Sequence, residues 1–217
     1  MPPLSSTFDR NDHIFPCPEG FRKMLDDAVR FFSGTPVHTL PPPVSFAGSG
    51  VYAIYCIATD GLYQKFGNEI NKYSYSVPIY VGKAVPNGWR QSREIQQATI
   101  TNTLYSRLRQ HARSIKEGNG IQLTDFACRF MILEGETASL TEAVEAALIA
   151  LFSPLWNSVI DGFGNHNPGK ERKTGRISQW DTLHPGRHWT EAMTGERPLK
   201  NQIVRRVKDY LAGLRQL

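Results

Sequence analysis

A single charged residue interrupts a helical stretch that is otherwise apolar. Glu145 lies in the segment 143–152, whose other residues are all apolar. A helix that is apolar on every side is normally buried, and a buried carboxylate must be ionised next to a cation, hydrogen-bonded or protonated. Glu145 is therefore a candidate metal-binding or catalytic carboxylate. The alternative is a Glu on a narrow exposed stripe of the helix.

An arginine and a histidine share one face of another expected helix. Arg107 and His111 lie four residues apart in the segment 103–117, where apolar residues recur with helical spacing. Side chains four apart can contact the same phosphate, and a planar guanidinium matches phosphate oxygens. Glu145 adds one hard oxygen ligand, which is sufficient for Mg²⁺ when water and phosphate complete its shell. Together these residue types are suited to phosphodiester hydrolysis, although each alone is an ordinary surface or core residue.

The basic charge of the chain is concentrated in two places. The 217 residues carry a net charge of +5, and residues 161–217, with 11 Lys and Arg against 6 Asp and Glu, hold the whole excess. A second basic stretch, residues 80–116, has seven Lys and Arg against one Glu. Two basic stretches on either side of a candidate metal carboxylate favour a nucleic-acid partner over an ordinary solvated face.

Composition also argues against several classes of protein. No apolar run approaches the ~20 residues of a membrane span, so no membrane association is expected. Residues 1–18 lack a hydrophobic signal core. Cys17, Cys56 and Cys128 are scattered, which argues against a structural zinc site or a disulfide framework. A reducing cytoplasm, in a bacterial cell, is the expected location.

The order of expected elements predicts an α+β fold, a small antiparallel β-sheet flanked by helices. Segments 51–57, 78–82 and 126–133 are expected strands, and helical periodicity marks 21–32, 103–117, the Glu145 segment and 203–214. Ser139 and Glu142 have the spacing of a capping box that opens the Glu145 helix. Residues 58–77 are too long for a tight hairpin and are expected to form a functional or mobile loop.

Six elements between residues 50 and 157 resemble, in the same order, those of the GIY-YIG nucleases. Gly50-Val51-Tyr52 corresponds to the first signature and Tyr80-Val81-Gly82 to the second. The third is a basic residue after the second signature, Lys83, and the fourth is an arginine with its partner four residues on, Arg107 with His111. The fifth is the metal carboxylate, Glu145, and the sixth is the polar residue after its helix, Asn157. Each element alone is commonplace, so the joint order carries the resemblance.

The chain departs from the family pattern in three ways. Val replaces Ile in both signatures, which is an isosteric change on a strand. The stretch 53–79 between the signature tyrosines is longer than usual and predicts a group-specific insertion. His111 stands where many members have Tyr, so activity is expected to fall as pH drops through the His pKa.

The resemblance implies a role for each of these residues. Tyr52 would orient or deprotonate the attacking water, and either Tyr52 or His111 would accept the proton. Tyr80, Lys83 and His111 would hold the water and the phosphate or relay protons, while Arg107 would stabilise the transition state. Glu145 would bind one Mg²⁺ per active site, and Asn157 would position Glu145 or the substrate.

Within the superfamily, the chain is most similar to the small type II restriction endonucleases that cleave CCGCGG. Segments 30–38, 79–93 and 154–166 carry this likeness. The expected helix at 21–32, the Pro-rich linker at 41–43 and the basic tail divide the chain into an N-terminal arm with one helix (1–45), a GIY-YIG-like catalytic core (46–160) and a basic C-terminal extension (161–217). Residues expected to contact DNA, whether at guanine edges or at phosphates, are Arg90, Arg93, Lys170, Arg172, Lys173 and Arg176.

If the target is a double-stranded palindrome and each chain has one active site, cutting both strands predicts a two-fold homodimer. A higher oligomer is an open alternative. The N-terminal arm is the expected dimer contact. Two other functions stay open at this point. One is a repair or mobile-element nuclease of the same superfamily, and the other is a DNA-binding module without catalytic activity.

Overall fold

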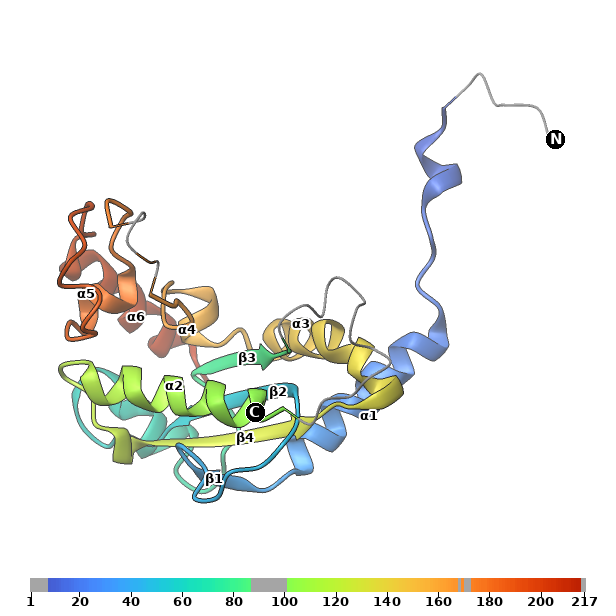
Figure 1. Ribbon diagram of the computed structural model, residues 1–217, viewed down its shortest axis with the longest axis horizontal. Coiled ribbons are helices and arrows are strands. Elements are labelled where there is room, and N and C mark those ends of the chain that lie inside the picture. The colour runs from blue at the N-terminus through green and yellow to red at the C-terminus, as the bar shows by residue number, and fades with distance from the viewer. Residues whose placement is uncertain (1–7, 87–100, 168, 170–172, 216–217) are drawn as a thin grey trace.

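A four-stranded antiparallel sheet with helices on both faces forms the body of the protein (Figure 1). The computed structural model describes residues 8–86, 101–167, 169 and 173–215. The strand order is β1-β4-β2-β3, with bounds Val37–Thr39 (β1), Gly50–Cys56 (β2), Tyr80–Ala84 (β3) and Phe126–Ile132 (β4). The predicted α+β class is confirmed.

The helices pack on the sheet in two groups. One group, α1 and α3, lies on one face, and α2 with the C-terminal helices lies on the other. Their bounds are Glu19–Gly34 (α1), Thr103–Glu117 (α2), Thr141–Phe152 (α3), Leu155–Ser158 (α4), Gln179–Leu183 (α5) and Lys200–Gly213 (α6), with short turns at Arg10–His13 (η1), Gly61–Tyr63 (η2), Phe66–Ile70 (η3), Leu123–Asp125 (η5) and Gly135–Leu140 (η6).

Strand β2 divides the core between these two faces. All seven of its residues are buried, and successive side chains point to opposite faces. Val51 and Ala53 pack with α1 and α3, whereas Tyr52 and Ile54 pack with α2 and the C-terminal helices. A strand buried on both faces is apolar along its whole length, which explains why this segment was recognisable in the sequence.

Strand β1 was missed by the sequence analysis. It pairs antiparallel with β4, with Val37 opposite Arg129, and α1 packs against α3. Residues 19–39 of the expected arm therefore lie against the core, while the described residues before α1 extend away from it (Figure 1). A three-residue edge strand is too short to show alternation, so it carries no period-2 signal. The boundaries at 45 and 160 stay a prediction.

The insertion after β2 is a packed part of the core rather than an open loop. Tyr63, Phe66 and Ile70 are buried, and the amide of Asn71 closes the segment. Asn71 Nδ2 donates to Cys56 O and to a second carbonyl at 3.0 Å each, and its Oδ1 accepts two backbone N–H groups at 3.1 Å. The expectation that 58–77 forms a long open loop is wrong for this part, which is buried and contains the turns η2 and η3.

The helix that carries Glu145 differs from its prediction in two respects. It is not buried on every side, since Leu151 is 55% exposed while Val144 and Leu148 are buried. The expected capping box is also wrong, because η6 runs directly into α3 and leaves no free first turn at Ser139. Glu134 and Thr137 form a capping box one turn earlier.

The C-terminal extension packs on the same core. Trp180 and Val207 are buried against the α2 side of the sheet. Tyr63 of the insertion accepts a hydrogen bond from Trp156 Nε1 at 3.2 Å and pairs with His184 Nε2 at 2.7 Å. No helix in the described part of the chain is long and apolar enough to cross a membrane.

Replacing Asn71 with Ala should lower the free energy of unfolding by about 2–4 kcal/mol, because buried backbone groups of Val77 and Cys56 lose their partners. Urea unfolding followed by circular dichroism measures this. Asn68→Ala is the control, since Asn68 is exposed and makes a single bond to Thr59 O at 2.9 Å. Equal destabilisation by both variants would contradict the role of Asn71.

Candidate active site

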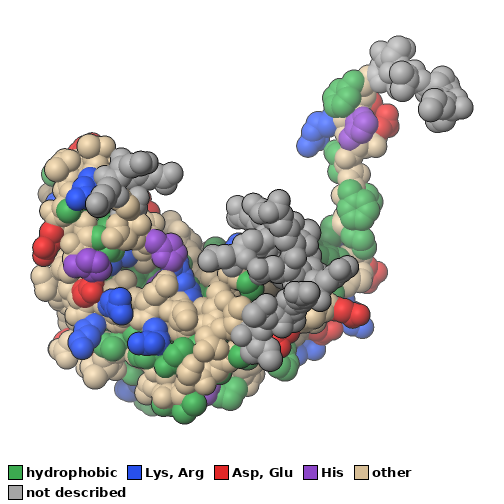
Figure 2. Space-filling model, in the orientation of Figure 1, with side chains coloured by type: hydrophobic (Ala, Val, Ile, Leu, Met, Phe, Trp, Pro, Cys, Tyr) green, Lys and Arg blue, Asp and Glu red, His purple; other side chains and the backbone are tan. Residues whose placement is uncertain are grey.

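The side chains selected from the sequence gather around β3, which lies at the edge of the sheet. Tyr52 and Tyr80 lie on the α2 face, whereas Lys83 and Glu145 lie on the α3 face. Side chains from both faces can approach the same space past an edge strand. Figure 2 shows this side of the molecule hollowed next to the C-terminal extension, with Lys, Arg and His side chains along one wall of the hollow.

The glycine of the second signature makes room for the tyrosine of the first. Gly82 pairs directly across from Tyr52 in the sheet. A Cβ atom at Gly82 would lie 2.5 Å from the Tyr52 hydroxyl oxygen, which is too close for any other residue without a shift of the ring. The Tyr52 ring therefore lies over the backbone of β3, with its hydroxyl directed toward α2.

That hydroxyl is hydrogen-bonded to a histidine on α2. Tyr52 Oη and His111 Nε2 are 2.6 Å apart, and both residues are buried. Burial raises the pKa of Tyr52 well above its usual value and lowers the pKa of His111 well below its own. The nearby Arg107 guanidinium opposes the rise in the pKa of Tyr52 and adds to the fall in the pKa of His111. Both side chains are therefore neutral at pH 7.

Tyr80 belongs to the same group of side chains. Its ring centroid is 5.2 Å from that of His111 and 6.2 Å from that of Tyr52. Burial raises the pKa of Tyr80, Arg107 acts to lower it, and Glu145 acts to raise it. The same two charges act on the pKa of Tyr52, so Arg107 and Glu145 lie close enough to affect both tyrosines from different sides.

Arg107 is held by residues that the sequence analysis did not select. Its Nη2 donates to Gly164 O at 2.8 Å, and its Nη1 lies 2.7 Å from His166 Nε2 and 3.1 Å from Gln110 Oε1. Gly164 and His166 come from the C-terminal extension. The only sequence signal for them was their position at the end of segment 154–166, which carries the likeness to restriction endonucleases.

Glu145 is paired rather than isolated. Its Oε2 lies 2.7 Å from Lys83 Nζ, and its side chain is 19% exposed. Glu142 lies farther from the same ammonium, at 3.5 Å, and its side chain is 54% exposed. No cluster of three or more His, Cys, Asp or Glu suited to a metal ion occurs among the residues that the structure describes. A metal at Glu145 would therefore need water or substrate for its remaining ligands.

Asn157 contacts the backbone of β3. Its Oδ1 accepts from Val81 N at 2.8 Å and its Nδ2 donates to Val81 O at 2.9 Å. The neighbouring Trp156 N donates to Ile79 O at 2.8 Å. Asn157 thus pairs the open edge of the strand that carries Tyr80 and Lys83, and its expected role in positioning Glu145 or the substrate stays a prediction.

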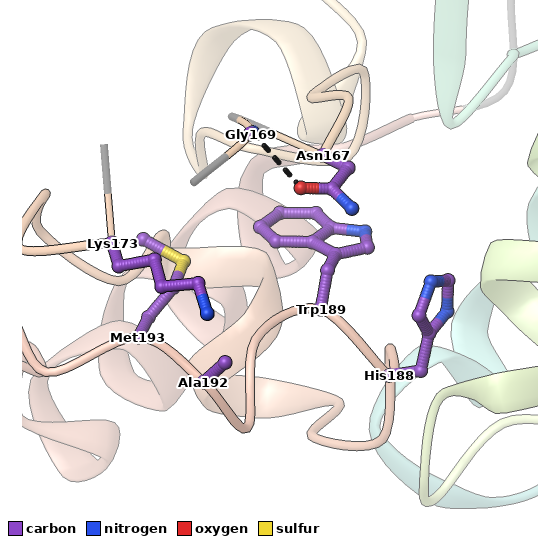
Figure 3. A pocket seen from close by; sticks show the side chains of 7 residues that line it. All are labelled: Asn167, Gly169, Lys173, His188, Trp189, Ala192 and Met193. Carbon is purple, nitrogen blue, oxygen red and sulfur yellow. Dashed lines mark hydrogen bonds between the residues drawn. The ribbon is translucent and has the colours of Figure 1, made fainter. Parts of the chain in front are cut away.

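Two of the six expected DNA contacts can be placed in the structure. Lys173 is exposed and lines a cavity of about 230 Å³ beside Trp189 and Met193 (Figure 3), and Arg176 is exposed nearby in the sequence. The other four, Arg90, Arg93, Lys170 and Arg172, lie outside the described residues. Their contact with DNA stays a prediction.

Comparison with known families agrees with this geometry. The model of a family described as the Eco29kI GIY-YIG domain matches residues 44–211. The chain belongs to this family. A search of curated proteins found no match. The match spans both signatures, α2, α3 and most of the C-terminal extension, so it supports a nuclease of the GIY-YIG type whose substrate is DNA.

Replacing Asn157 with Leu should expose the Val81 amide to exchange and lower the free energy of unfolding by about 2–3 kcal/mol, because two buried backbone groups lose their partners. Hydrogen exchange at Val81 and urea unfolding measure these effects. Asn157→Asp is the control, since it keeps the acceptor for Val81 N and should preserve that amide's protection. Unchanged protection in Asn157→Leu would show that Asn157 does not hold the strand.

Proposed function

We propose that this protein is a type II restriction endonuclease that hydrolyses phosphodiester bonds in double-stranded DNA at a specific palindrome, with CCGCGG as the expected site. The observation that carries the proposal is the convergence of the Tyr52–His111 pair, Arg107 and Glu145 around one edge strand, within a chain that belongs to the Eco29kI GIY-YIG family. The sequence likeness of segments 30–38, 79–93 and 154–166 supports the restriction type and the site.

The proposed cofactor is one Mg²⁺ per active site, and the residues at the site fit it. Glu145 offers a hard carboxylate oxygen that is partly exposed, and Mg²⁺ accepts one protein carboxylate when phosphate and water fill its other positions. When bound, the ion supplies positive charge at the leaving 3′ oxygen. Lys83, already 2.7 Å from Glu145, would hold that carboxylate in place and balance its charge before substrate arrives.

Proton transfer would run through the Tyr52–His111 hydrogen bond. Because burial raises the pKa of Tyr52 well above its usual value, Tyr52 is not a phenolate that could act alone as the base. It can take a proton from the attacking water only as it passes its own proton to His111 Nε2, 2.6 Å away. This arrangement favours His111 as the final acceptor, with Tyr52 as the relay.

Arg107 would neutralise charge on the phosphate as the bond to water forms. Its position one helical turn before His111 brings a guanidinium next to the hydroxyls of Tyr52 and Tyr80. Fixed donors directed at developing charge are commonly the largest single contribution to such catalysis. Tyr80 would help to hold the water and the phosphate from the β3 side.

We also propose that the protein acts as a homodimer or a higher oligomer. Its proposed location is the cytoplasm of a bacterial cell. A palindrome is cut on both strands by two copies related by a two-fold axis. The N-terminal segment is the proposed contact between the two copies, because it exposes large apolar side chains. Phe8, Ile14 and Phe15 are 79%, 50% and 82% exposed, and Phe31 of α1 is 64% exposed. Large apolar side chains exposed on an extended segment are typical of a surface that another chain covers.

Plasmid DNA incubated with the protein and Mg²⁺ should give discrete fragments whose ends map to one palindrome. Glu145→Gln should slow cleavage by roughly 10²-fold or more while DNA binding persists, because a metal ligand is lost. Glu142→Gln is the matched control, since Glu142 also contacts Lys83 and should leave cleavage nearly unchanged. A smear of products would contradict the proposed type II restriction activity, and a preference for branched DNA would favour a repair nuclease. No cleavage at all would contradict the proposed nuclease activity.

The single-turnover cleavage rate at saturating Mg²⁺ should stay level as pH falls to the ordinary imidazole pKa of about 6.5, and decline only below it. The reason is that burial and Arg107 hold the pKa of His111 well below its usual value, so His111 loses its acceptor nitrogen only in more acid solution. An acid limb centred at or above 6.5 would show that His111 is not the buried neutral acceptor. Tyr52→Phe should be slow at every pH, since it breaks the relay.

A further inference from the structure

A second histidine reaches the active site from the C-terminal extension. His166 Nε2 lies 2.7 Å from Arg107 Nη1, and the other ring nitrogen, Nδ1, lies 3.1 Å from the same atom. His166, Arg107 and His111 line the same cleft of about 210 Å³. His166 is exposed, whereas His111 is buried. Of the two imidazoles, His166 is therefore the one that a bound molecule can reach directly.

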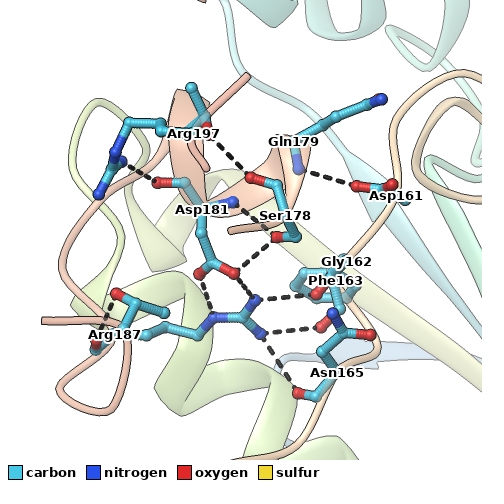
Figure 4. A network of polar contacts seen from close by, with 11 residues as sticks. Asp161, Gly162, Phe163, Asn165, Ser178, Gln179, Asp181, Arg187 and Arg197 are labelled. Atoms are coloured by element: carbon cyan, nitrogen blue, oxygen red, sulfur yellow. Dashed lines mark hydrogen bonds and ion pairs between the residues drawn. The ribbon is translucent and has the colours of Figure 1, made fainter. Parts of the chain in front are cut away.

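The loop that carries His166 is fixed by a buried arginine (Figure 4). Arg187 is fully buried, and its Nε and Nη2 each lie 2.6 Å from an oxygen of Asp181. The same guanidinium donates to three backbone carbonyls of the loop, Gly162 O at 2.8 Å, Phe163 O at 3.2 Å and Asn165 O at 3.3 Å. All five of its N–H donors are thus used, so the loop has one well-defined shape.

Arg187 is also enclosed by aromatic rings. Its guanidinium carbon lies 4.7 Å from the ring centroid of Trp180 and 4.6 Å from that of Trp189. Burying an ion pair in this way costs desolvation energy that well-packed apolar residues would not, so a buried pair contributes more to a specific geometry than to net stability. The geometry it fixes here is that of residues 162–166, next to Arg107.

The charges around His166 suit a phosphate ligand. Burial, Arg107 and Arg187 lower the pKa of His166, so the ring is neutral and accepts the hydrogen bond from Arg107. A neutral imidazole that accepts at one nitrogen carries its hydrogen on the other. This second nitrogen, Nδ1, lies 3.1 Å from the same Arg107 Nη1, so its N–H is placed to donate to an oxygen of a group bound beside Arg107. A phosphodiester is an anion whose oxygens only accept hydrogen bonds, so it fits Arg107 and His166 together.

We propose that His166 is a further catalytic residue, which donates a hydrogen bond to the scissile phosphate beside Arg107 while Arg187 holds its loop in position. This inference rests on the proposed nuclease function. It assigns to the C-terminal extension a direct part in the chemistry, in addition to any contact with DNA bases.

Cleavage kinetics test the proposal with variants of two residues that line the same cleft. His166→Ala should lower kcat by roughly 10²-fold with little change in KM, as loss of one fixed donor does. Ser114→Ala is the matched control, because Ser114 lines the same cleft and is not part of the catalytic group, so it should change kcat by less than about threefold. His166→Gln should restore part of the rate, since it keeps a neutral donor. Equal kcat in wild type and His166→Ala would overturn the proposal.

A second measurement does not depend on cleavage. In metal-free buffer, histidine-ring ¹H–¹⁵N spectra should show the His166 resonances, assigned with His166→Gln, shift when a duplex containing CCGCGG is added. His166 ring resonances that do not shift when the duplex is added would overturn the phosphate contact. This outcome also covers the case in which His166→Ala is slow only because Arg107 has moved. If the wild-type chain does not cut DNA, the proposed function fails, and the ring shift still decides whether His166 binds the duplex.

Discussion

The hydrogen bond between Tyr52 and His111 is the interaction on which the rest of the site depends. It joins the central strand β2 to α2 through the interior of the protein, at 2.6 Å between two buried side chains. It requires Gly82, since a larger residue there would collide with the Tyr52 hydroxyl. Once α2 is held in this way, Arg107 must lie one turn before His111, beside the same strand edge. Several separate sequence elements are thereby tied to one geometry.

The edge position of β3 explains why the remaining parts are needed. An edge strand leaves backbone N–H and C=O groups unpaired, and here Asn157 and Trp156 supply partners for Val81 and Ile79. The open edge also lets Glu145 and Lys83, on the α3 face, approach the tyrosines on the α2 face. The C-terminal extension then completes the wall next to Arg107 through a loop organised by Arg187.

Much of the core followed from local patterns. The segment Gly50–Cys56 was recognisable as a buried strand because it is apolar without interruption, and α2 because Leu104 and Leu108 repeat with helical spacing. Features without a local pattern were missed or misjudged. Strand β1 is too short, the capping residues of η6 lie one turn before the expected pair, and the insertion is buried through Tyr63 and Phe66 against residues distant in sequence.

The sequence by itself determined the family, the order of the main strands and helices from β2 to α3, and the candidate side chains near β3, because signature spacing and helical periodicity are local properties of the chain. Only the tertiary structure decided which charges meet. It paired Glu145 with Lys83, directed Asn157 to the backbone of Val81, and brought His166 to Arg107. Each of these contacts joins two residues that are 59 to 76 positions apart in the sequence. No local pattern in the sequence encodes the packing that brings such residues together.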